Sequence, residues 1–182
     1  VLPYIPIFFL TSTDIVRPDD RVLDMFAGSG TVLLEASTHP YHPRTSYGVE
    51  INPLGRLISK VKTKPLDPAI LDASLRDVLA IAPTCQPTLP SYSKIDFWFP
   101  RQNQSALGKL REAIDRRLAD GDVRDFFRIC LAVTVRRCSF ADPDVPPPVR
   151  LAPDRYPAGS PRHARAEAHR AKVLSLDPLG IF

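Results

Sequence analysis

The feature that most constrains this sequence is a small-residue loop between an apolar run and a helical pattern. Arg21–Met25 is β-branched and apolar, which predicts a short buried strand, and the loop Phe26–Gly30 follows it. A helix is predicted to begin at Thr31, and Thr45–Val49 predicts a second strand. Asn52-Pro53 then has the residue types of a helix N-cap and first turn. This order of strand, loop, helix, strand and helix predicts an α/β fold, as at the opening of a doubly wound sheet.

The residues of the loop indicate that it binds a ligand. Gly28 and Gly30 permit positive φ and let a ligand approach the backbone, and the N–H groups of the next helix can bind an anion. Glu50 ends the second strand, where a carboxylate can accept hydrogen bonds from both hydroxyls of a ribose. A dinucleotide fingerprint would need glycine at Leu33, and the Gly-Lys-Ser/Thr of a P-loop is absent. The pattern therefore favours another nucleotide-type ligand, and its alternative is a tight strand–helix turn.

The remaining chain is predicted to be mainly helical, with proline-rich connections. The helix that begins at Asn52-Pro53 is expected to bury Leu54, Leu57, Ile58 and Val61. The helix that begins at Asp67-Pro68 is expected to present Ile70, Leu71, Leu75, Val78 and Leu79 on one side. The other segments are an apolar helix or extended segment (1–15), a proline-rich loop (83–90), an aromatic strand or docking turn (95–100), two amphipathic helices (104–118 and 122–137), an irregular proline-rich stretch (141–161) and a basic helix (162–176).

Basic side chains are concentrated toward the C-terminal end of the sequence. Residues 1–100 carry 9 basic and 10 acidic side chains, whereas residues 101–182 carry 15 and 10. Thirteen of those 15 are arginines, which suit bidentate contacts with phosphate. This bias is compatible with a nucleic-acid partner. The alternative interpretation is that the arginines lie on helix faces exposed to solvent.

The cysteines and the apolar runs allow predictions about metal binding, the cellular compartment and membrane insertion. Cys85, Cys130 and Cys138 have no metal-like spacing, so no metal site is predicted. Cys130 and Cys138 lie among apolar residues at helical spacing, which predicts buried thiols and a reducing, cytoplasmic compartment. No run approaches the roughly 18 apolar residues of a membrane span, so no membrane partner is expected.

Two motifs resemble a known family. The run DMFAGSGTVLLEA, from Asp24 to Ala36, resembles the DPFAGSGT motif of S-adenosylmethionine-dependent DNA amino-methyltransferases, which modify adenine N6 or cytosine N4. GVEINP, which contains Glu50, resembles the second motif of that group. KVKTKPLDP, IDFWF and VRRCSFADPDVPPP resemble an insert in a subset of bacterial and phage DNA methylases. The resemblance covers roughly residues 4–150 and implies a partial Rossmann-like methyltransferase fold with a helical insert.

The resemblance implies roles for individual residues. Asp24 would face the methionine amino group of S-adenosylmethionine, Phe26–Gly30 would wrap its methionine and ribose, and Glu50 would bind the ribose hydroxyls. Ile51 would pack against the adenine. Met25 stands where the family usually has proline, an apolar exchange that should not abolish binding. The expected cofactor-binding residues are Asp24, Phe26, Ala27, Gly28, Ser29, Gly30, Thr31, Glu50, Ile51 and Asn52.

The sequence lacks the family's base-binding motif, an (Asp/Asn/Ser)-Pro-Pro-(Tyr/Phe/Trp) run that holds a flipped base. Consecutive prolines occur only in Val145–Val149, with no polar residue before them and no aromatic residue after, which predicts a polyproline II linker. No catalytic residue is therefore assigned. Since the sequence begins with Val1, has Met25 as its one methionine and ends directly after an apolar run, we expect a fragment of a longer protein. The resemblance places the missing base-binding motif beyond Phe182, with a lost N-terminal copy as the alternative, and we expect the fragment alone to be inactive.

The resemblance implies a DNA methyltransferase of a restriction-modification system, with DNA as partner and S-adenosylmethionine as cofactor. The alternatives are an RNA methyltransferase and a non-catalytic S-adenosylmethionine-binding module. The sequence assigns no oligomeric state. The expected organisation is a cofactor-binding part (1–66), a helical insert of the same domain (67–140), a proline-rich linker (141–161) and a basic helical tail (162–182).

Overall fold

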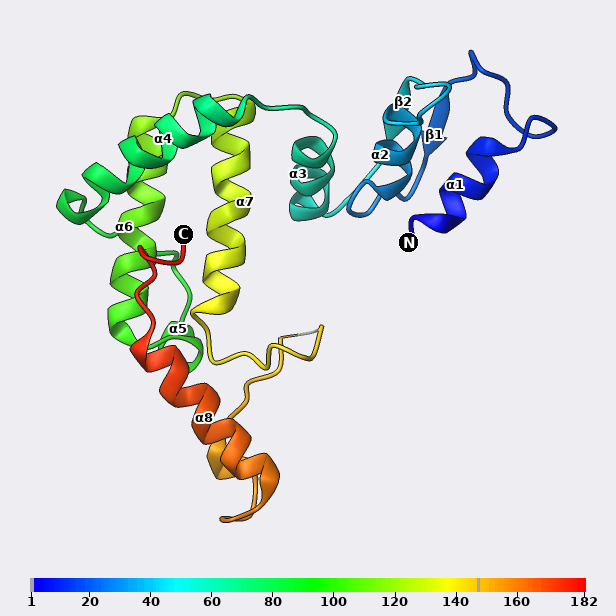
Figure 1. Cartoon of the computed structure of the whole chain (residues 1–182). Coiled ribbons are helices and arrows are strands. Elements are labelled where there is room, and N and C mark those ends of the chain that lie inside the picture. The colour runs from blue at the N-terminus through cyan, green and yellow to red at the C-terminus, as the bar shows by residue number, and fades with distance from the viewer. Residues whose placement is uncertain (1, 147) are drawn as a thin grey trace. The chain divides into compact units, whose positions relative to one another are not determined.

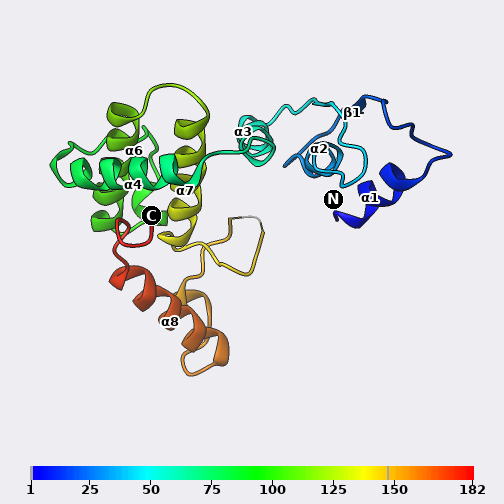
Figure 2. The same cartoon turned by 45° about the horizontal axis from the view of Figure 1, so that its top comes forward.

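The computed structural model describes residues 2–146 and 148–182 as two compact units, one ending at Asp67 and the other beginning at Pro68 (Figures 1 and 2). The first unit contains two strands and three helices. Their bounds are α1 (Tyr4–Thr11), β1 (Val22–Asp24), α2 (Thr31–Ser37), β2 (Ser46–Gly48) and α3 (Pro53–Lys62). Each predicted strand is present and shorter than expected, and α2 begins at the predicted residue. The small parallel sheet with its helices confirms a mixed fold of helices and strands.

The two strands run parallel, with Leu23 opposite Tyr47. The sheet packs closely against α2 because Gly48 has no side chain. A Cβ at Gly48 would lie 2.6 Å from Cδ1 of Leu33 and 2.9 Å from Cβ of Ala27. The opposite side of the strands stays open, and Leu23 and Tyr47 are both more than half exposed. The sheet therefore has one face covered by a helix and one bare apolar face.

Helix α3 begins as predicted, but the prediction of its buried face is wrong. The Asn52 side-chain oxygen accepts hydrogen bonds from the N–H groups of Leu54 at 2.9 Å and Gly55 at 3.5 Å, so it caps the helix. The buried residue of α3 is Ser59. Leu54 is exposed, and the other three predicted residues, Leu57, Ile58 and Val61, are only half-buried. A sheet of two strands offers too little surface to cover a helical apolar stripe, so α3 packs through a small residue.

The second unit is helical. Its elements are α4 (Pro68–Ile81), the 3-10 helix η1 (Ala82–Thr84), α5 (Ile95–Trp98), α6 (Arg101–Arg117), α7 (Asp122–Arg137), the 3-10 helix η2 (Pro153–Arg155) and α8 (Pro161–Ser175). The predicted helices are confirmed, with α7 at the predicted bounds. The aromatic run after residue 94 is a short helix, so the strand alternative is wrong. Within the proline-rich stretch, Ala141 and Arg150 form an antiparallel bridge, and Leu151 and Ala152 are buried.

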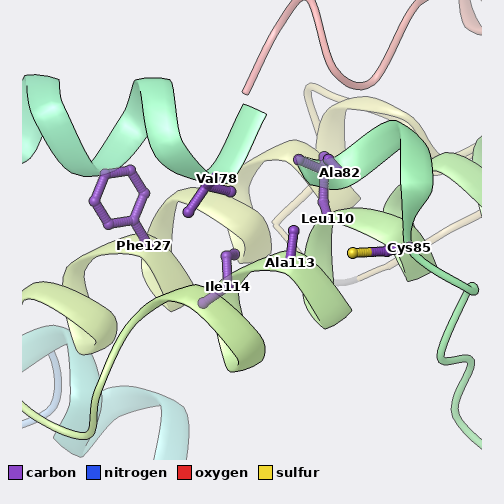
Figure 3. Packing of buried hydrophobic residues seen from close by; sticks show 7 residues of the cluster. All are labelled: Val78, Ala82, Cys85, Leu110, Ala113, Ile114 and Phe127. Atoms are coloured by element: carbon purple, nitrogen blue, oxygen red, sulfur yellow. The ribbon is translucent and has the colours of Figure 1, made fainter. Parts of the chain in front are cut away.

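The core of the second unit lies between α4, α6 and α7 (Figure 3). It consists of seven buried residues: Val78, Ala82, Cys85, Leu110, Ala113, Ile114 and Phe127. Of the apolar side predicted for α4, Val78 is fully buried, and Leu71, Leu75 and Leu79 pack against the edge of this core. Ile70, also predicted on this side, is 52% exposed and is not among the residues that pack against the core.

A single polar side chain connects three helices of this unit. Asn103, in the first turn of α6, is fully buried. Its amide nitrogen donates to the backbone carbonyl of Cys138, just after α7, and to that of Val173 in α8, both at 3.1 Å. These bonds satisfy two buried carbonyls and fix the end of α8 against α6.

We expect Asn103→Leu to lower the free energy of unfolding by about 2–4 kcal/mol, because two buried carbonyls would lose their donors. The matched control is Gln102→Ala, since Gln102 donates to the Leu174 carbonyl from an exposed position where water can replace it. Urea unfolding followed by the fluorescence of Trp98, the one tryptophan of the sequence, measures both variants in this unit. Equal stability of Asn103→Leu and the wild type would contradict the proposed bracing role.

Candidate functional site

The loop between β1 and α2 has the glycine conformations that the sequence predicts. Gly28 has φ 53° and Gly30 has φ 74°, both in the left-handed region. The two glycines differ in the space around them. A Cβ at Gly30 would lie 2.9 Å from Cα of Ser59, whereas the nearest atom to a Cβ at Gly28 is the Phe26 carbonyl oxygen at 3.9 Å. Gly30 thus allows α3 to pack on the loop, and Gly28 faces open space.

The carboxylate of Glu50 joins the loop to the end of the second strand. One of its oxygens accepts a hydrogen bond from the N–H of Gly28 at 2.7 Å, and the other accepts one from the N–H of Asn52 at 2.7 Å. Glu50 is half-buried. A carboxylate has about four acceptor positions, so two remain for donors from outside the chain. Glu50 therefore holds the loop in place and still has the capacity to bind hydroxyl groups.

Two further hydrogen bonds connect α3 to the loop and to the first residue of α2. The Ser59 hydroxyl donates to the Gly28 carbonyl at 2.9 Å, and the Lys62 ammonium donates to the Thr31 hydroxyl at 3.3 Å. Sequence reasoning did not identify Ser59 or Lys62, both of which lie 31 residues from their partners. A local signal exists only for Ser59, a small polar residue beside apolar positions of a helix. The loop is thus held by α3 as well as by Glu50.

The structure brings the predicted site residues to the carboxyl ends of the two strands. Asp24 accepts a hydrogen bond from the N–H of Phe26 at 3.0 Å. Ala27 and Thr31 are buried. Ser29 is exposed, and Phe26 and Ile51 are 88% and 97% exposed. Carboxylates beside bare apolar side chains suit a ligand that carries hydroxyl or amino donors and an apolar ring.

Several titratable groups of the second unit have pKa values shifted by burial or by hydrogen bonds. Burial raises the pKa of the Cys130 thiol and raises that of Cys138 to about 11, so neither thiol is a ready nucleophile. Cys138 is buried as predicted, and Cys130 is half-buried. Hydrogen bonds from Arg165 hold the pKa of Asp142 below its usual value, and Arg165 also pairs with Asp144 at 2.6 Å.

The predicted polyproline linker Val145–Val149 includes Pro147, which lies outside the described residues. The N–H of Asp142 donates to the carbonyl of Val149 at 2.7 Å, so the two sides of this segment are joined. In residues 2–146 and 148–182, no group of three His, Cys, Asp or Glu side chains is arranged to hold a metal, and no helix is long and apolar enough to cross a membrane.

Comparison with known proteins identifies one similar curated protein. No protein-family model and no solved structure matches the chain. The chain is 30% identical over 172 residues to the Type II methyltransferase M.MvaI of Kocuria varians. The match covers 88% of this chain and 37% of that protein, so the chain spans less than two-fifths of the length of its relative. The match supports the resemblance to methyltransferases that the sequence motifs indicate.

Proposed function

We propose that this chain is the cofactor-binding part of a DNA methyltransferase of a restriction-modification system, which methylates adenine N6 or cytosine N4 with S-adenosylmethionine. The observation that carries the proposal is the Glu50 carboxylate, which holds the Gly28 N–H at the carboxyl edge of two parallel strands. A nucleotide-type ligand is expected at this edge in open α/β sheets. The similarity to a Type II methyltransferase supports this particular ligand. In this proposal the first unit belongs to a partial Rossmann-like fold.

The residues of the loop fit the chemical groups of S-adenosylmethionine. The two free acceptor positions of Glu50 would bind the ribose hydroxyls. The exposed Ile51 would cover one face of the adenine, and Asp24 would attract the methionine ammonium. The open space at Gly28 leaves room for the ligand against the backbone. Ala27, Ser29, Gly30, Thr31 and Asn52 would contribute through their backbones and through the shape of the loop.

When bound, S-adenosylmethionine supplies an electrophilic methyl group on a sulfonium. This chain would hold and orient that donor, which is the part of catalysis that comes from proximity. The sequence contains no polar-Pro-Pro-aromatic run to receive the amino group of a target base. The acceptor half of the reaction would therefore reside in a segment outside these 182 residues.

We expect Gly28→Val to abolish binding of S-adenosylmethionine, because its side chain would occupy the open space at the loop. Gly159→Val is the matched control, since Gly159 has φ 80° and also has no atom within 4 Å of a built Cβ, but it lies in the second unit. Isothermal titration calorimetry measures the affinity of both variants. An affinity for S-adenosylmethionine equal to that of the wild type in Gly28→Val would contradict the proposed site.

We expect Glu50→Gln to weaken cofactor binding at least about tenfold, since hydrogen bonds to a charged acceptor contribute about 1.5–3 kcal/mol each. It should also lower the melting temperature, because an amide group cannot accept both the Gly28 and Asn52 N–H bonds. Glu35→Gln, on α2, is the control for charge in the same unit. A lower melting temperature with an unchanged dissociation constant would assign Glu50 to holding the loop alone.

We expect the purified chain to transfer no methyl group to DNA, because an extruded base would find no pocket to offset a few kcal/mol of unstacking. The assay incubates the chain with tritiated S-adenosylmethionine and mixed-sequence DNA, both single- and double-stranded. Gly28→Val gives the background. Label in DNA above that background would mean that the acceptor site is within this chain.

A further inference from the structure

The second unit contains a hollow of about 700 Å³ beside α8, apart from the loop that we assign to the cofactor. The start of α6 lies beside the end of α8 (Figure 1), and Gln102 donates there to the Leu174 carbonyl. Arg101 at the start of α6 and the α8 residues from His163 to Leu174 line one side of the hollow. The proline-rich stretch forms the other side through Arg150 and the η2 turn. Three arginines line the hollow: Arg101, Arg150 and Arg170.

Arg150 is held in a fixed orientation with unused hydrogen-bond donors. Its guanidinium carbon lies 4.6 Å from the centre of the Phe97 ring and 5.5 Å from that of Phe140. Its backbone pairs with Ala141. Its Nε is buried and has no hydrogen-bond partner. Because buried donors in native proteins are nearly always satisfied, this Nε–H is available to an acceptor from outside the chain.

The charged side chains that line the hollow form no ion pairs with one another in the part of the chain that the structure describes. Asp96, Asp154 and Glu167 line it together with the arginines, yet no ion pair within 4.0 Å joins these six side chains in the described chain. Asp96 accepts a hydrogen bond from the Gln104 amide. Elsewhere in the same unit arginines are paired, such as Arg124 with Asp115 at 2.6 Å. The hollow therefore presents guanidinium donors and carboxylate acceptors that are kept apart.

We propose that this hollow binds a nucleotide unit of a DNA strand, an inference that rests on the proposed function for the choice of DNA. The phosphate accepts from the arginines, for which their planar donor groups are suited. The carboxylates accept from base amino groups, as Asp and Glu do with cytosine, and the aromatic lining covers apolar parts of the base or sugar. Residues 68–182 carry 17 basic and 13 acidic side chains, a surplus that attracts a polyanion.

The test measures fluorescence anisotropy of fluorescein-labelled 20-nucleotide single strands and duplexes with the full chain at low salt. We expect Arg150→Gln to weaken DNA binding at least about tenfold, in line with the loss of a charge-assisted contact. Arg76→Gln is the matched control, because Arg76 is an exposed arginine of α4 outside the hollow and removes the same charge. We expect less than about a twofold effect there, consistent with one diffuse charge.

Two further measurements keep the outcome interpretable. Arg170→Gln changes an exposed residue of α8 that lines the hollow, so it should weaken DNA binding even if Arg150→Gln fails to fold. Calorimetry with a free deoxynucleoside monophosphate distinguishes a free nucleotide from a DNA strand as the source of the same chemistry. The proposal is supported if the affinity for DNA or for the mononucleotide is lower in the Arg150 or Arg170 variant than in the wild type.

Equal losses in the Arg76 variant and the hollow variants would overturn the proposal, since they would show only the effect of net charge. Absence of binding of both DNA and mononucleotide by the wild type would overturn it as well. Cofactor affinity is measured on the same samples. Intact cofactor binding without DNA binding would reject the hollow alone, whereas lost cofactor binding would reject the proposed function.

Discussion

The carboxylate of Glu50 is the interaction on which the first unit depends. It accepts from two backbone N–H groups, one in the loop after β1 and one at the start of α3. Gly28 lies 22 residues before Glu50 in the sequence, so this carboxylate ties the loop to the end of the second strand, together with the backbone hydrogen bond from the N–H of Ala27 to the carbonyl of Val49. Ser59 then closes the same arrangement from α3. A site built in this way is formed before any ligand arrives, which lowers the entropy cost of binding.

The local features of this site are predictable from the sequence because they depend on neighbours along the chain. Two glycines between a strand and a helix indicated positive φ, and Asn52-Pro53 indicated a capped helix; the structure has both. The roles of Ser59 and Lys62 were not predictable, because their partners lie 31 residues away. The prediction of the buried face of α3 was wrong for a related reason. An apolar stripe predicts a buried helix face only when enough surface lies opposite, and a sheet of two strands does not provide it.

The second unit shows the same division between local and distant information. The periodicity of its long helices predicted their bounds, because each helix carries its own apolar pattern. The aromatic run Ile95–Trp98 had no such period, and it forms a short helix. The hollow beside α8 joins residues more than 70 positions apart, from Asp96 to Leu174, and no spacing along the chain reveals it. Only the structure shows that, among the residues it describes, the arginines of the hollow lack ion pairs while other arginines of the same unit have them.

Gly28 and Gly30 in the loop and Gly48 in β2 differ in how far the fold itself would tolerate a side chain at each position. Gly30 and Gly48 are surrounded by other atoms of the chain, so a side chain at either position would displace α3 or α2. Gly28 is bounded by open space. The fold alone would thus tolerate a change at Gly28, at the modest cost of a non-glycine residue such as asparagine in the left-handed region, while Gly30 and Gly48 are needed for packing. Under the proposed function, loss of Gly28 with Gly30 and Gly48 retained would mark a homologue that no longer binds the cofactor.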